Sequence, residues 1–172
     1  VVAYTLLCNH IPLQAEIIGA NDHESYFAFD IWHNNNTDIM PQISTDDIHI
    51  VNRANFAIMY WFNGKLYPRF TNIEAQRQHL YCGNWHEKYN NFTIKPRGEI
   101  KRNLIESQSD NLERIIATLG SRNISQSSLI RKLCTYKQEH QTRQALFEFD
   151  KIVRSNHMLR YLLDPDIITI TH

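Results

Sequence analysis

The chain changes its hydrophobic periodicity along its length, and this change most constrains the fold. Residues 1–9 are rich in β-branched and aromatic side chains, which predicts a strand. Leu13, Ala15 and Ile17 alternate with other residues in the next stretch, which predicts a second strand paired with the first as a hairpin. From about residue 101 onward the apolar residues recur at helical spacing. We therefore expect an α/β protein that begins with an antiparallel hairpin and ends in a mainly helical region.

The segment after the hairpin predicts a helix over about residues 21–33. Tyr26, Phe29 and Trp32 recur every third residue and would share one face. Asn21 or Asp22 is the expected N-cap. Three consecutive asparagines at 34–36 are expected to end the helix.

A third strand is predicted in "TDIMPQIST", directly before two aspartates. Pro41 lacks an N–H and therefore predicts an irregular or edge position. Ile39, Ile43 and Asp47 share one parity along this strand. The segment "RANFAIMYWFNGK" then predicts a buried helix closed by an Asn-Gly turn. A hairpin, a helix and a strand that ends in aspartate form the middle of an RNase H-like core, which is one candidate fold among several.

The region after residue 101 predicts three helices from their apolar stripes. Their expected N-caps are Ser109, Ser125 and Thr142, and the first helix is expected to stop at Gly120. Asp164-Pro165 is expected to close the last helix.

Composition excludes several classes of protein. The 172 residues contain 18 Lys plus Arg and 18 Asp plus Glu, so any nucleic-acid surface must be a local patch. No apolar run approaches 18 residues, which predicts no transmembrane helix and no membrane partner. Cys8, Cys82 and Cys134 are widely spaced and odd in number, which predicts reduced thiols in the cytoplasm. Cys8 lies among apolar strand residues and is expected in the core.

Two groups of polar residues allow both a structural and a chemical interpretation. Asp46 and Asp47, in "STDDIHIVN", form either a turn or helix cap or a metal site. His79, Cys82 and His86 have spacings that suit zinc but lack a clear fourth ligand, which favours an ordinary loop with a buried thiol.

Several blocks along the chain resemble one family of DNA transposases. The blocks are "NHIP", "IGANDHES", "FDI", "STDDIHIVNRANFAIMYWF", "YPRF", "FTIKP", "DNLERIIATLG", "SQSSLIRKL" and "QALFEFDKIVRSNHMLRYLLDPD". They occur in the order seen in the catalytic domain of the Tn-three (Tn3) family of replicative, class II transposons, and they cover nearly all of the sequence. The resemblance implies residues 1–70 as a partial RNase H-like catalytic core and residues 71–172 as a mostly helical segment of the same domain.

The resemblance also implies an Asp-Asp-Glu triad that binds Mg²⁺ for DNA strand transfer. Counting along the family block places its second aspartate at Asp47, with Asp46 as the alternative. His49 belongs to the same block and is expected beside the catalytic site, with Asn52 a weaker candidate. We expect the first aspartate of the triad upstream of Val1 and the glutamate beyond "LLDPD", because the ending "IITITH" does not resemble the family.

The chain departs from the family pattern at positions that bear on activity. Ile50 stands where the family has glycine, and Ser109 stands where it has tryptophan. With one triad position present, we expect no catalysis and no Mg²⁺ binding by this chain alone, and either marginal stability or association with itself or full-length transposase. A non-catalytic DNA-binding or interaction remnant, or a decayed gene product, are the alternatives.

Basic residues after the catalytic block are the candidates for contact with transposon-end and target DNA. Interleaved glutamates leave open that they form an ordinary solvated face. The candidates are Lys95, Arg97, Lys101, Arg102, Arg131 and Lys132, followed by Lys137 and Arg143.

Overall fold

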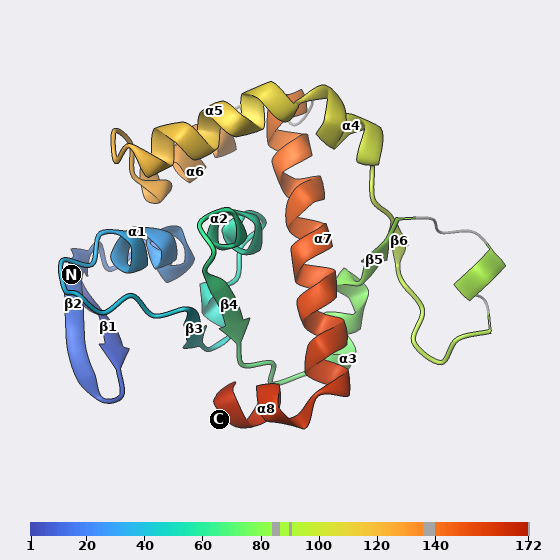
Figure 1. The fold of residues 1–172 in the computed structure, drawn as a ribbon, viewed down its shortest axis with the longest axis horizontal. Coiled ribbons are helices and arrows are strands. Elements are labelled where there is room, and N and C mark those ends of the chain that lie inside the picture. The colour runs from blue at the N-terminus through green and yellow to red at the C-terminus, as the bar shows by residue number, and fades with distance from the viewer. Residues whose placement is uncertain (84–86, 90, 136–139, 172) are drawn as a thin grey trace.

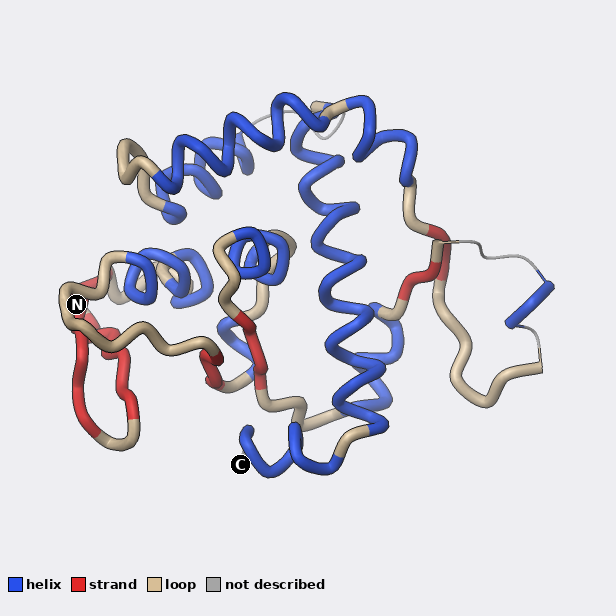
Figure 2. The backbone as a smooth tube through the Cα atoms, viewed as in Figure 1, coloured by secondary structure: helices blue, strands red, loops and turns tan. Residues whose placement is uncertain are grey.

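The structure is a computed structural model that describes residues 1–83, 87–89, 91–135 and 140–171. It contains a mixed α/β core followed by a mainly helical region, which confirms the predicted fold class (Figure 1). The described strands form three separate two-stranded sheets. Figure 2 shows that helices make up more of the molecule than strands, and that α7 (Gln141–Leu163) runs through its middle.

The predicted hairpin is confirmed. Strands β1 (Val2–Cys8) and β2 (Ile11–Ile18) pair antiparallel, and Asn9 and His10 turn between them with φ angles of 49° and 66°. Side chains of β1 alternate, so that Tyr4 is half-buried while its neighbour Thr5 is exposed. The expectation that Cys8 lies in the core is wrong, because the hairpin is covered on one face only and Cys8 at its end stays half-buried.

The third strand is shorter than predicted. Strand β3 (Ile43–Asp46) pairs parallel with β4 (Lys65–Pro68), and β5 (Tyr81–Cys82) pairs parallel with β6 (Gly98–Glu99). Residues 37–42 are outside β3 because the backbone there forms hydrogen bonds with side chains instead of with a strand. The carbonyl of Pro41, for example, accepts from Trp32 Nε1 at 2.7 Å. Ile39 and Asp47 therefore do not share a strand parity with Ile43, and that expectation is wrong.

The helices lie close to their predicted positions, with different caps. His23 rather than Asn21 or Asp22 caps the first turn, since its Nδ1 accepts from the N–H of Ser25. The bounds are η1 Glu24–Tyr26, α1 Ala28–His33, η2 Ile48–Ile50, α2 Asn55–Trp61, α3 Ile73–Gln76, η3 Arg77–His79, η4 Glu87–Tyr89, α4 Arg102–Ser107, α5 Ser109–Gly120, α6 Gln126–Thr135, α7 Gln141–Leu163 and α8 Pro165–Thr171.

The later caps also shift by one or two residues. Gln108 precedes α5 where Ser109 was expected, and His140 caps α7 where Thr142 was expected, because its Nδ1 accepts from the N–H of Arg143. Ser125 does cap α6, as predicted, by accepting from the N–H of Ser128.

One hydrophobic cluster joins both halves of the chain. It contains side chains from α1, α2, β4, α5, α6 and α7, including Phe29, Phe56, Leu66, Leu119 and Leu146. A smaller cluster packs β4 and the end of α7 against α8 (Figure 1). Residues on either side of position 70 therefore share one core rather than two.

A buried polar network connects α1, α2 and α6 inside that core. The Asp30 carboxylate accepts the N–H groups of Gln126 and Ser127 in the first turn of α6. The Gln126 side chain accepts from the N–H of Phe29 at 2.7 Å and donates to Asn55 Oδ1. Since a buried polar group without a partner costs about 1–3 kcal/mol, these bonds stabilise the core by satisfying its buried polar groups.

Asp150 of α7 plays the same part at the start of α2. Its carboxylate is buried and accepts from the N–H of Ala57 at 3.0 Å. Burial raises the pKa of Asp150 to about 7, against the opposing effect of the α2 backbone N–H groups.

Replacing Asp150 tests this cap through the pH dependence of stability. A raised carboxyl pKa means that the folded state holds the proton more tightly, so this contribution to stability is lost as pH rises from about 4 to about 7. Asp150→Asn removes this titration and keeps one oxygen for Ala57. The free energy of unfolding of the variant, minus that of the wild type, should increase over this range in urea titrations. A difference that is independent of pH would contradict the buried, protonated carboxyl.

Candidate functional site

A groove separates β1 from β3. It has a volume of about 360 Å³ and is lined on one side by residues 4–7 and on the other by residues 43–46. Ala28, Ile31 and Ile50 also line it and make it partly apolar. Among the described strands, β1 pairs with β2 alone and β3 with β4 alone, so the edges that face the groove have no strand partner. In Figure 1, β1 is the hairpin strand that lies toward β3.

Asp46 ends β3 and lines this groove. Its Oδ2 accepts from Tyr4 Oη at 3.3 Å, and its Oδ1 accepts from the N–H of Asp47 at 2.7 Å. Burial raises the pKa of Asp46, with a further rise from the neighbouring Asp47 charge. Burial also raises the pKa of Tyr4, and the Asp46 carboxylate adds to this rise. A half-buried carboxylate at the end of a strand therefore faces a hydroxyl donor across the groove.

Asp47 lies one residue further on and is exposed. It is the N-cap of η2, and its Oδ1 accepts from the N–H of His49 at 2.7 Å. Asp47 is thus a helix cap, which was one of the two roles that the sequence allowed for Asp46 and Asp47, the other being a metal site.

His49 and Asn52 follow Asp47 with different surroundings. The ring of His49 is exposed and lies 6.4 Å from the ring of His23, centroid to centroid. Asn52 caps α2, since its Oδ1 accepts from the N–H groups of Ala54 and Asn55, and its Nδ2 donates to the carbonyl of Ser25.

No metal centre is assembled within the described part of the chain. No group of three or more His, Cys, Asp or Glu side chains there is close enough together to hold an ion. Of the three residues considered for zinc, His86 lies outside the described residues, and the Cys82 thiol donates to the carbonyl of Gly98 at 3.7 Å.

The predicted DNA-contacting residues are divided between two regions. Lys95, Arg97, Lys101 and Arg102 lie around β6 and the start of α4, on the opposite side of α7 from α6 (Figure 1). Lys95 and Arg97 line a recess beside α3. Arg102 lies 3.9 Å from Glu106 in an exposed ion pair. The structure does not bring all of these residues together.

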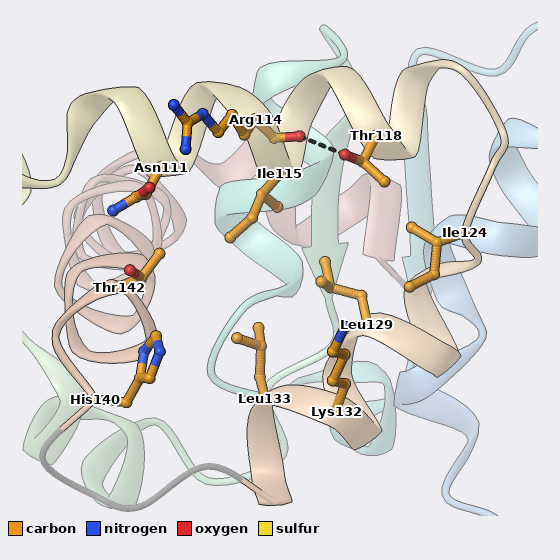
Figure 3. A pocket seen from close by; sticks show the side chains of 10 residues that line it. All are labelled: Asn111, Arg114, Ile115, Thr118, Ile124, Leu129, Lys132, Leu133, His140 and Thr142. Atoms are coloured by element: carbon orange, nitrogen blue, oxygen red, sulfur yellow. Dashed lines mark hydrogen bonds between the residues drawn. The ribbon is translucent and has the colours of Figure 1, made fainter.

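The residues on α6 and α7 have local partners or line a separate cavity. Arg131 pairs with Asp22 at 2.7 Å and lies over the ring of Phe27. Arg143 lies over the ring of Phe147 at 5.2 Å, and Lys137 falls outside the described residues. Lys132 lines a cavity of about 270 Å³ between α5, α6 and the start of α7. Figure 3 shows Ile115, Ile124, Leu129 and Leu133 in this cavity beside Arg114, Lys132 and His140.

Arg97 and Lys101 also line a further cavity, of about 510 Å³, beside α7. Arg53, Lys151 and Arg154 line it as well. Sequence analysis did not propose these three as DNA contacts. The spacing of Phe147, Lys151 and Arg154 by three or four residues on α7 was an available signal, but the apolar stripe of the same helix obscured it.

Comparison with known protein families decides the identity of this arrangement. A family model described as the Tn3 transposase DDE domain matches residues 1–169. The chain belongs to the Tn3 transposase DDE domain family. Its function therefore lies in DNA transposition, with DNA as substrate, as the sequence blocks predicted.

The family match extends to residue 169, and so includes the first three residues of the ending "IITITH", which did not resemble the family by its sequence blocks. That segment forms α8, whose Ile167 is buried in the smaller hydrophobic cluster. Comparisons with curated proteins and with solved structures gave no significant match. Within the described ranges, no helix combines the length and apolar character needed to cross a bilayer.

The contact between Tyr4 and Asp46 can be tested in this DDE domain by Tyr4→Phe. Removing the hydroxyl takes a donor from the ionised carboxylate, so the Asp46 pKa should rise further, measured by NMR titration. Stability should fall by about 0.5–1.5 kcal/mol in denaturant unfolding, as for a typical hydrogen bond. Tyr60→Phe, at an exposed ring on α2, is the control. Equal behaviour of the two variants would contradict the contact.

Proposed function

We propose that this chain forms part of the catalytic domain for metal-dependent DNA strand transfer, and that Asp46 is the triad carboxylate it contributes. The family match supports the reaction class. The position of Asp46 supports its role, because it ends a strand, lines the groove between two unpaired sheet edges and is half-buried. Asp47, predicted from the sequence, is the alternative triad member.

The donor set fits Mg²⁺ as a partial site. Carboxylate oxygens are hard ligands of the kind that Mg²⁺ prefers, and Asp46 offers two of them. When bound, Mg²⁺ supplies the positive charge that activates an attacking hydroxyl and stabilises the leaving oxygen of the DNA phosphate. Because one carboxylate cannot hold two such ions alone, we propose that the other ligands come from outside the described residues.

This chain's own residues would fix the direction of the Asp46 side chain. The Tyr4 hydroxyl and the N–H of Asp47 each donate to one oxygen of the carboxylate and favour its ionised form. Each carboxylate oxygen accepts one of these hydrogen bonds and has a second lone pair, with which it could coordinate a cation. His49, whose charge lowers the pKa of Asp46, is the proposed neighbour of the same site.

The groove supports a further part of the proposal. An extended segment that carries the first aspartate of the triad would satisfy the unpaired edges of β1 and β3 and bring that carboxylate beside Asp46. The exposed apolar side chains of the hairpin, Leu7 at 58% and Ile17 at 75%, support contact with further polypeptide of the transposase or of a second copy. Since DNA is the substrate, we propose that the chain acts in the compartment that holds the DNA, the cytoplasm or nucleoid.

A chimera tests the choice between the two aspartates. The chain replaces the corresponding segment of a Tn3-family transposase, and Mg²⁺-dependent strand transfer is measured on transposon-end DNA. Asp46→Asn should lower the rate by at least about 100-fold, because losing a metal ligand costs more activity than losing a residue that only hydrogen-bonds to a ligand. Asp47→Asn is the matched control and should stay within a few-fold of the unsubstituted chimera. The reverse order would identify Asp47 as the ligand.

The isolated chain provides a second test. If its site is incomplete, the purified 172-residue chain should give no strand transfer with Mg²⁺ and transposon-end DNA. Clear Mg²⁺-dependent joining by the chain alone would refute this part of the proposal. A non-catalytic DNA-binding role is favoured by the basic cavity beside α7, and it would be indicated by DNA binding together with an inactive chimera.

A further inference from the structure

The cavity beside α7 gathers positive charge from segments that are distant in sequence. It lies where the loop before α2, strand β5 and the start of α4 meet one face of α7. Arg53, Arg97, Lys101, Lys151 and Arg154 line it, and Glu148 and Asp150 are the carboxylates that line it. Cations therefore outnumber carboxylates five to two among its lining residues.

Both carboxylates are already engaged by other groups. Glu148 accepts from Lys151 Nζ at 2.6 Å and, through its other oxygen, from the N–H of Lys101 at 3.0 Å. Asp150 is buried and accepts from the α2 backbone, and burial raises its pKa to about 7. Neither carboxylate forms an ion pair with an arginine of the cavity, as judged within the described part of the chain.

Four cations of the cavity therefore form no close ion pair with a carboxylate among the residues that the structure describes, although the charges of Arg154 and Asp150 act on each other. They are Arg53, Arg97, Lys101 and Arg154. Arg154 is half-buried, donates through Nη2 to Gln76 Oε1 at 2.9 Å and has a buried Nε without a hydrogen-bond partner. A guanidinium held in this way has donors available for a ligand.

His79 also lines the cavity, and its pKa is sensitive to the charges of the arginines around it. Burial lowers its pKa, and the charges of Arg154, Arg97 and Arg53 lower it further. The ring of Phe147 lies under Arg53, at 5.9 Å from the guanidinium carbon to the centroid, and so holds that arginine at the cavity. The arrangement concentrates positive potential in a concave surface rather than spreading it over a solvated face.

We propose that this cavity binds a phosphate group of the DNA backbone. The inference rests on the proposed function, because it assumes that DNA is the substrate. Arginine forks match phosphate oxygens with paired hydrogen bonds, and three arginines and a lysine reach this cavity from four segments. The cavity is lined by residues other than those of the Asp46 groove, so it would position DNA and not take part in the chemistry.

The experiment measures binding of the 172-residue chain to duplex DNA in EDTA, as a function of salt, so that no metal chemistry is required. Arg97→Gln and Lys101→Gln change exposed residues of the cavity. Each should weaken binding about tenfold and lower the salt slope by about 0.9, as expected for loss of one charge-assisted phosphate contact. Arg160→Gln and Lys65→Gln are matched exposed controls that do not line the cavity and should match the wild type.

Two further comparisons complete the test. Arg154→Lys keeps the charge and removes the fork, and should weaken binding while thermal unfolding confirms the fold. Inorganic phosphate should compete only at concentrations far above those of DNA phosphate. The proposal is overturned if the cavity variants bind like the controls, if inorganic phosphate binds as tightly as DNA, or if the wild type does not bind DNA at low salt. None of these results depends on strand transfer, so the role of Asp46 would be judged separately.

Discussion

The side chain of Gln126 connects the helical region to the segment that presents the acidic site, and the rest of the structure depends on this buried contact. It accepts from the backbone of α1 and donates to Asn55 at the start of α2. Asn55 in turn donates to the carbonyls of Ser25 and Ile50, and so holds the turn that follows Asp46 and Asp47. Asp30 completes the network by capping α6. Because each of these groups is buried, removing one leaves another without a partner, at about 1–3 kcal/mol each.

The same framework separates two kinds of charge. The carboxylates of Asp46 and Asp47 lie at the end of β3, whereas the guanidinium and ammonium groups of the basic cavity gather beside α7. Asp150 links the two regions, since it lies on α7 and caps the helix that directly follows the acidic turn. The proposed function needs both features: carboxylates to hold a cation and cations to hold DNA. On this proposal, their separation would let the DNA be held without neutralising the carboxylates.

The sequence predicted the hairpin, the buried helix and the late helices because these depend on periodicity and local turn signals. It missed the start of β3, because the contact of Trp32 with Pro41 that keeps residues 37–42 out of the strand is a tertiary one. The caps by His23 and His140 were missed because histidine is not among the usual N-cap residues. Counting family positions could not decide between Asp46 and Asp47, because a shift of one residue in the count changes which carboxylate is expected at the site. The sequence also could not show that Arg53 and Arg154 line the same cavity, because only the folded chain brings these distant residues together.

The central claim is that buried contacts from α6 hold the acidic turn in place. Hydrogen exchange in Gln126→Ala tests it most directly, at the amides of Ile50, Val51, Ala54 and Asn55, which are bonded within residues 47–55. These amides should exchange faster in the variant than in the wild type, by a larger factor than the amides in the middle of α5. Equal acceleration throughout the chain, or faster exchange confined to α6, would contradict the claim that Gln126 positions the turn that carries Asp46.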